Sequence, residues 1–209
     1  MKRTLVALGL SIFCLGLTGC PQVFDALVNS QNPHSLSASK GKGSSISLSW
    51  QAPNFASDDT TTVSKYHIYR DGGELNTTTS TGWTDSAPLA AHQYSYYVTA
   101  DLVKDGISST SGRSNSDDGW YVPAVDLPLG TENSPQTTPS STGWYETLVV
   151  KGWTYHFSPS GGTLSWSPEN EPWHQTSLGG GTDWTWTPGS TGKVWLYLTG
   201  SAILTAWYD

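Results

Sequence analysis

The 209-residue sequence is poor in charged side chains, and poorest in basic ones. Only 13% of the residues are charged, and 10 Lys and Arg against 17 Asp and Glu give a net charge of −7. A protein that holds a nucleic acid needs clustered basic residues against the phosphate backbone. We therefore expect no nucleic-acid partner.

Cysteine is nearly absent, since only Cys14 and Cys20 occur, both near the N-terminus. No thiol remains downstream for a disulfide, a zinc site or a nucleophile. The five histidines show no paired metal-ligand spacing, and no segment resembles a nucleophile elbow or offers a histidine with a positioned acid. We therefore expect no metal, no cofactor and no catalytic centre, and predict that the protein is not an enzyme.

Features of helical proteins are also scarce, whereas turn-forming residues are abundant. The sequence has one Met but 22 Gly and 12 Pro, and short segments of alternating apolar residues recur between turns. This pattern is typical of short, half-buried strands. It predicts an all-β protein.

The most apolar segment lies at the N-terminus. Three residues, Met1-Lys2-Arg3, precede an apolar stretch over 4–17 that is too short to span a bilayer as a stable helix. The next small residues, Leu17-Thr18-Gly19-Cys20, resemble the bacterial lipobox, in which a signal peptide is cut before a lipid-modified cysteine. An ordinary secretory signal with a chance cysteine is the alternative. The resemblance implies a signal peptide over 1–19 and a lipid on Cys20 that anchors the protein in a membrane.

The segment 20–34 carries few periodic apolar positions and is predicted to be a lipidated tether. Pro21 and Gln22 follow the cysteine, where the inner-membrane retention signal of enteric bacteria has an Asp. The lipoprotein resemblance therefore implies the bacterial outer membrane. It leaves open whether the protein faces the periplasm or the cell surface.

Residues 35–123 show the strand spacing of a β-sandwich, and their motifs resemble a fibronectin type III domain. These motifs are Ile46-Ser-Leu-Ser-Trp50-Gln-Ala-Pro53, Tyr66-His-Ile-Tyr-Arg-Asp-Gly72, Thr84-Asp85, and Leu89 followed five places later by Tyr94-Ser-Tyr-Tyr-Val-Thr-Ala100. The resemblance implies that Trp50 fills the space between two sheets and that Asp71-Gly72-Gly73 forms a turn. It also implies that the hydroxyl of Tyr94 bonds to the backbone near Leu89. The last strand is the least regular part of the pattern.

Pro, Ser and Thr dominate residues 124–142, which we predict to be a linker, although 126–131 could supply the first strand of a second domain. The composition then changes, because eight of the eleven tryptophans lie within residues 143–209. Alternating apolar positions there predict a second, small, jelly-roll-like β-sandwich. Its motifs, such as Gly152-Trp-Thr-Tyr155 and Thr191-Gly-Lys-Val-Trp-Leu196, resemble the accessory modules at the C-terminal ends of secreted bacterial peptidases.

The tryptophans of this second domain fall into two groups. A domain of this size without disulfide or metal needs large buried side chains for stability, and alternation places Trp153, Trp166, Trp184 and Trp186 in the core. The remaining candidates are Trp173, in a Pro-rich loop, and Trp195, Tyr197 and Trp207, which alternate with inward-facing aliphatic residues. Those four are predicted to form a ligand-binding platform, or else to be surface aromatics or to be covered by the other domain.

Three functional hypotheses follow from this organisation. The first is a lipoprotein that acts as a non-catalytic binding or adhesion module for a carbohydrate or for a host or envelope protein. The second is a structural subunit of a cell-envelope assembly. The third, ranked last, is a small hydrolase with acids such as Glu169 and Asp183.

Overall fold

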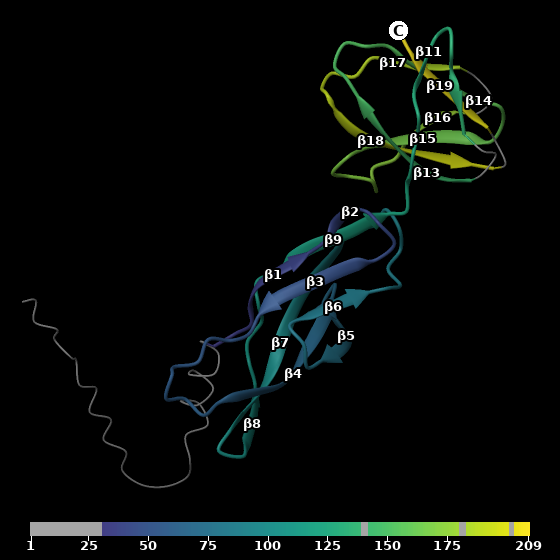
Figure 1. Ribbon diagram of the computed structural model, residues 1–209. Coiled ribbons are helices and arrows are strands. Elements are labelled where there is room, and N and C mark those ends of the chain that lie inside the picture. Colours follow the sequence, from purple (N-terminus) through teal and green to yellow (C-terminus); the bar gives the residue numbers. More distant parts are fainter. Residues whose placement is uncertain (1–30, 139–141, 180–182, 201–202) are drawn as a thin grey trace, which may run out of the picture.

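The computed structural model describes residues 31–138, 142–179, 183–200 and 203–209. These residues form two β-sandwiches, one built from β1–β9 and the other from β10–β19 (Figure 1). The prediction of an all-β protein with two sandwiches is confirmed. The predicted signal peptide and Cys20 lie outside the described residues. Within the described ranges, no helix has the length and apolar character needed to cross a membrane.

The first sandwich has a fibronectin type III-like fold. One sheet has the order β1 (His34–Ala38), β3 (Ile46–Gln51), β6 (Gly82–Asp85). The other has the order β2 (Lys40–Lys42), β9 (Asp117–Val122), β7 (Tyr94–Lys104), β4 (Thr62–Arg70), β5 (Gly73–Thr78), with β8 (Ile107–Thr110) paired to β7. Strand β3 alternates strictly between buried and exposed residues, because one of its faces covers the core.

The details expected from the fibronectin type III resemblance are confirmed. Trp50 is buried between the sheets and packs edge-on against Tyr66, with ring centroids 5.4 Å apart. The backbone N–H of Leu89 donates to the hydroxyl of Tyr94 at 2.9 Å. Asp71 and Gly72 both have positive φ, 51° and 84°, as a tight hairpin turn between β4 and β5 requires.

The second sandwich also consists of two sheets. One has the order β10 (Val125–Asp126), β13 (Gly143–Val149), β18 (Gly192–Thr199), β15 (Thr163–Pro168), β16 (Thr176–Gly179). The other has the order β11 (Gly130–Thr131), β19 (Leu204–Tyr208), β14 (Tyr155–Pro159), β17 (Trp184–Trp186), with β12 (Gln136–Thr137) paired to β19. The apolar positions of these strands meet in one buried core.

The segment predicted as a linker, 124–142, is in large part built into the second sandwich. Strand β10 pairs in parallel with β13, and β11 and β12 both pair with β19. Leu127 is buried in the core of this sandwich. The two sandwiches are therefore joined closely after β9. The Pro-rich stretch forms edge strands, and its composition alone does not predict how these strands pair.

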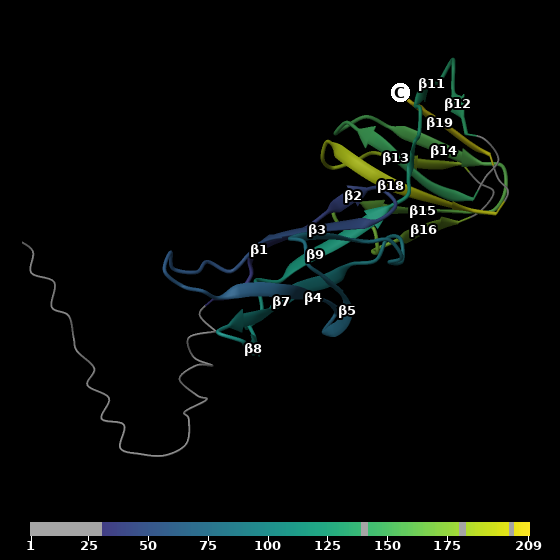
Figure 2. The ribbon, with the colours of Figure 1, turned by 60° about the horizontal axis from the view of Figure 1, so that its bottom comes forward.

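The two sandwiches contact each other through an aromatic interface. The outer face of β18 carries Trp195 and Tyr197 toward the end of β9, where Trp120 is buried. The ring centroid of Trp120 lies 6.3 Å from that of Trp195, with the planes nearly perpendicular. The close approach of the two bodies is visible in both ribbon views (Figures 1 and 2).

Candidate ligand-binding site

The structure brings together three of the four residues predicted as a binding platform. Trp173, Trp195 and Tyr197 all belong to the interface cluster around Trp120. Trp195 does lie on the outer face of its sheet, as alternation indicates, but it is only 2% exposed because the first sandwich covers it. The expectation of a free indole at Trp195 is therefore wrong, and the alternative of cover by the other domain holds for this residue.

Tyr197 and Trp207 are both partly buried. Tyr197 packs on Trp144, with ring centroids 4.8 Å apart. Trp207 lies on the other sheet, where its ring stacks on His156 at 4.9 Å with the planes 4° apart. Trp207 is thus separate from the other three candidates, and a binding role for it stays a prediction.

The interface tryptophans hold the loop between β15 and β16 in place. The indole N–H of Trp195 donates to the backbone carbonyl of Glu169 at 2.8 Å. Trp173, further along the loop, packs edge-on against Trp120 with ring centroids 6.1 Å apart. Two backbone hydrogen bonds, from Glu171 to Pro168 and from His174 to Glu171, add local turns. The loop is therefore fixed by the neighbouring sandwich as well as by its own backbone.

This fixed loop forms one wall of a cleft of about 630 Å³ at one end of the second sandwich. We call it the loop cleft. Its lining includes Trp166, Glu169, Asn170, Glu171, Trp186 and Lys193. Trp166 and Trp186 come from different sheets and lie with ring centroids 5.2 Å apart and planes at 34°. Both are partly exposed at the rim of the core.

The charges of the loop cleft are mixed. Lys193 forms an ion pair with Glu146, Nζ to Oε1, at 2.6 Å, and this hydrogen bond raises the pKa of Lys193. Nδ1 of His174 lies 3.0 Å from Oε2 of Glu171. Carboxylate, amide and ammonium groups thus stand beside two indole rings. This combination suits a ligand with many hydroxyl groups and apolar C–H faces, because the polar groups bond hydroxyls while the indoles pack on the C–H faces.

Of the four tryptophans predicted to lie in the core, three pack against it and one does not. Trp166, Trp184 and Trp186 do pack against the core, although each stays partly exposed. Trp153, also predicted to be core, is 44% exposed and packs on Tyr208. It lies just before β14, so strand alternation does not govern its direction. Trp120 carried no sequence pattern that would have revealed its part in the interface.

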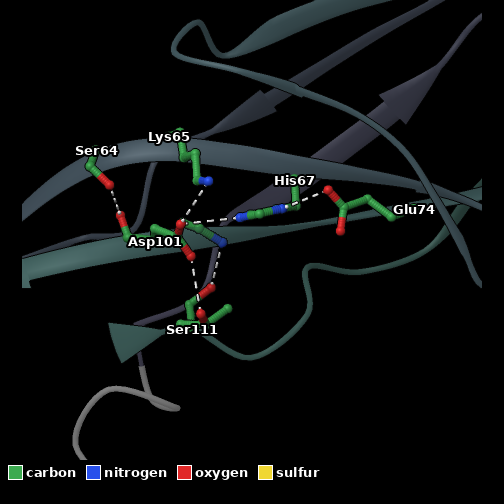
Figure 3. A network of polar contacts seen from close by, with 8 residues as sticks. Ser64, Lys65, His67, Glu74, Asp101 and Ser111 are labelled. Carbon is green, nitrogen blue, oxygen red and sulfur yellow. Dashed lines mark hydrogen bonds and ion pairs between the residues drawn. The ribbon is translucent and has the colours of Figure 1, made fainter. Parts of the chain in front are cut away.

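A network of polar contacts surrounds His67, but it does not have the geometry of a catalytic centre (Figure 3). Nδ1 of His67 lies 3.0 Å from Oε1 of Glu74, and Nε2 lies 3.2 Å from Oδ2 of Asp101. The hydrogen bond to Glu74 raises the pKa of His67, an effect that burial opposes and Asp101 reinforces. Because both ring nitrogens are engaged by carboxylates, neither is free to take a proton from a substrate.

The acids of the hydrolase hypothesis lie in different settings. Glu169 lines the loop cleft, whereas Asp183 accepts a hydrogen bond from the hydroxyl of Ser158. Among the described residues, no group of three or more His, Cys, Asp or Glu is placed to hold a metal ion.

Comparison with known proteins gives partial matches. No family model matches the chain. The chain is 31% identical over 140 residues to an alpha-amylase of Niallia circulans, covering 65% of this chain and 9% of the relative. It is 34% identical over 82 residues to a poly(3-hydroxybutyrate) depolymerase of Ralstonia pickettii, covering 39% and 14%. The chain therefore spans only about a tenth of the length of these curated relatives.

Solved structures with a similar chain path include fibronectin type III proteins. A two-domain fibronectin type III segment of chicken tenascin is 16% identical with a TM-score of 0.32, covering 83% of this chain and 90% of that one. The central fibronectin type III array of RIM-binding protein is 13% identical with a TM-score of 0.35, covering 82% and 64%. An alpha-L-rhamnosidase of Dictyoglumus thermophilum is 8% identical with a TM-score of 0.38, covering 86% and 27%.

Proposed function

We propose that this protein is a non-catalytic binding module whose second sandwich holds a carbohydrate in the loop cleft. The observation that carries the proposal is the loop cleft itself. Partly exposed Trp166 and Trp186 lie there beside Glu171, Asn170 and Lys193. A preorganised wall lowers the entropic cost of binding, and the interface with the first sandwich supplies that preorganisation.

The curated relatives support an accessory role. One is named an amylase and the other a depolymerase, and the chain matches only a small fraction of each. A segment of that size fits a domain that accompanies a catalytic unit better than it fits the catalytic unit. The resemblance of residues 143–209 to the accessory modules of secreted bacterial peptidases supports the same interpretation.

We also propose that the protein is a bacterial lipoprotein, anchored through acyl chains on Cys20 in the outer membrane and displayed for adhesion. The Leu17-Thr18-Gly19-Cys20 sequence supports this proposal. An anchor of two or more acyl chains holds a protein durably on a membrane, whereas one chain binds reversibly. The first sandwich would then act as a spacer between the lipid and the glycan.

Retention of residues 21–209 on immobilised polysaccharides tests the cleft assignment. The panel contains amylose, cellulose, chitin and peptidoglycan. Asn170→Ala and Glu171→Ala alter exposed loop side chains, and we expect each to weaken retention about tenfold, since a lost hydrogen bond to a ligand contributes about 1.4 kcal/mol. Leu148→Ser, a change at an exposed residue of the same sandwich, serves as the control. No retention of the wild-type protein on any polysaccharide contradicts the proposal and favours a structural subunit of an envelope assembly.

Metabolic labelling with a clickable fatty acid tests the anchor separately. We expect the wild-type protein to incorporate the label and to fractionate with membranes. Cys20→Ala is expected to lose both properties, because the acceptor thiol is gone. Label incorporation by the Cys20→Ala variant would contradict the assignment of the lipid to this residue.

A further inference from the structure

A second hollow lies at the same end of the second sandwich. It has a volume of about 410 Å³, and we call it the aromatic hollow. Its lining comprises Thr131, Glu132, Asn133, Gly152, Trp153, Tyr208 and Asp209. Trp153 is 44% exposed, and its ring packs on Tyr208 with centroids 4.8 Å apart and planes at 37°. One indole face is thus supported from behind while the side chain remains accessible.

The side chains around the aromatic hollow indicate the class of ligand. Two carboxylates, of Glu132 and Asp209, and the amide of Asn133 line it, and its lining has no basic side chain. Anionic ligands are therefore disfavoured. A neutral ligand with hydroxyl groups fits, because carboxylates and amides bond hydroxyls and an indole packs on the C–H face of a sugar ring.

The aromatic hollow and the loop cleft are joined by a continuous row of rings. Tyr208 lies 6.2 Å from buried Tyr155, which in turn lies 6.5 Å from Trp186 of the loop cleft. Trp153 and Trp166 extend the row at its two ends, at 4.8 Å from Tyr208 and 5.2 Å from Trp186. The rings of the two hollows are therefore connected through the buried ring of Tyr155.

The loops between the two hollows are bonded to each other. Gly152 donates its N–H to the carbonyl of Pro188 at 3.3 Å, and Lys151 donates its N–H to the hydroxyl of Thr191 at 3.0 Å. The backbones of Thr154 and Asp209 also exchange two hydrogen bonds, of 3.1 and 3.2 Å. The aromatic hollow is therefore held in a fixed position relative to the loop cleft.

We infer that the aromatic hollow is a second subsite for the same glycan chain, so that the protein binds a neutral oligosaccharide that crosses the end of the sandwich from one hollow to the other. This inference rests on the proposed function of the loop cleft. It adds the ligand class, a neutral chain of several sugar rings rather than a single sugar. It also gives direct contact roles to Trp153, Glu132 and Asn133.

Calorimetric titration with oligosaccharides of increasing length tests the inference. The probes are maltose to maltoheptaose, cellobiose to cellohexaose and chitobiose to chitohexaose. We expect affinity to rise with length in the series that binds. Trp153→Ala and Glu132→Gln are expected to reduce affinity for the longest member about tenfold and to leave the shortest member unchanged. Asn170→Ala is expected to weaken binding at every length, because it alters the loop cleft.

The controls separate failure of the inference from failure of the proposed function. Trp207→Ala removes a partly buried indole from the outer face of β19 and so tests that face as an alternative site, and melting temperatures of all variants show whether they are folded. Length-independent affinity in the wild-type protein, or full affinity of Trp153→Ala for the longest member, overturns the second subsite and leaves the loop cleft intact. Loss of binding in Trp207→Ala, with Trp153→Ala unaffected, moves the subsite to that outer face and also overturns the inference. Absence of binding by the wild-type protein in all three series overturns the inference and the proposed function together.

Discussion

At the scale of single residues, one tyrosine in each sandwich makes the same type of hydrogen bond. Tyr94 accepts a hydrogen bond from the N–H of Leu89 at 2.9 Å, and Tyr155 accepts one from the N–H of Val150 at 2.8 Å. In each case the donor lies five residues earlier in the chain. The first contact was predictable from the fibronectin type III pattern. The second was not, because no comparable motif surrounds Tyr155.

Removing either hydroxyl tests these contacts. We expect Tyr94→Phe and Tyr155→Phe each to lower the free energy of unfolding by about 1 kcal/mol, since a backbone N–H loses its partner. Urea unfolding measures the effect. Tyr69→Phe is the control, because its ring stacks on Tyr97 and the ring is retained. A loss no larger than that of the control would show that the hydroxyls do not contribute.

Gly119 in β9 is a position where packing forbids a side chain. A Cβ there would lie 2.7 Å from Cγ2 of Ile46 and 3.0 Å from Cβ of Ala38. We expect Gly119→Ala to destabilise the protein by about 1–3 kcal/mol through overpacking of the core. Gly73→Ala, where the nearest atom lies 3.7 Å away, is expected to be close to neutral in the same denaturant measurement. Equal stability of the two variants would contradict this packing.

His67 makes stability depend on pH. Its pKa is raised above the ordinary value of 6.5 by Glu74, with a further contribution from Asp101. Protonation therefore favours the folded state, and the stabilisation is fully present below about pH 6.5 and lost as the pH rises through the folded pKa. We expect the wild-type protein to exceed His67→Gln in stability at pH 5.5 and to lose that advantage by pH 8.5. An advantage that grows toward high pH would contradict the contacts in Figure 3.

At the scale of elements, β18 shows what a strand pattern can and cannot predict. Val194, Leu196 and Leu198 face the core, and Trp195 and Tyr197 face outward, as alternation requires. Alternation assigns a residue to a face of the sheet but does not say what covers that face. Trp195 packs against Trp120 on β9 of the other sandwich, which lies more than seventy residues earlier in the chain. The local sequence around Trp195 cannot predict a contact between residues so far apart in the chain.

The edge strands of the second sandwich illustrate the same limit. β10, β11 and β12 span only two residues each, which is too short to show a period of two. Pro, Ser and Thr are frequent in the segment that contains these three strands, so its composition favours a linker. Tertiary pairing with β13 and β19 overrides that local preference.

Substitution of Trp120 tests the interface between the two sandwiches. We expect Trp120→Ala to loosen the two sandwiches relative to each other, because Trp173 and Trp195 lose the ring they pack against. Small-angle scattering should then show a larger radius of gyration than for the wild-type protein. Trp83→Ala, which removes a partly buried ring of the first core, is the control and should leave the radius unchanged in the folded protein. Identical radii for all three proteins would contradict a rigid interface.

At the scale of the whole molecule, the first sandwich has a supporting role toward the second. The cluster of Trp120, Trp173 and Trp195 positions the loop that lines the cleft. The two-sandwich architecture could be predicted from the sequence, because alternation and turn residues are local. The loop cleft could not, since Trp166 and Trp186 lie on different sheets and become neighbours only when the two sheets pack against each other.

The indole N–H resonances of the eleven tryptophans offer the most direct measurement of glycan binding at this end of the second sandwich. The resonances are assigned with single Trp→Phe variants. The protein is then titrated with the longest oligosaccharide that it binds, and nuclear magnetic resonance records the indole N–H signals. We predict shifts at Trp153, Trp166 and Trp186 and stationary signals from Trp50 and Trp83 in the first sandwich. Shifts confined to Trp207, or no shift at any of the three predicted positions, would contradict the account.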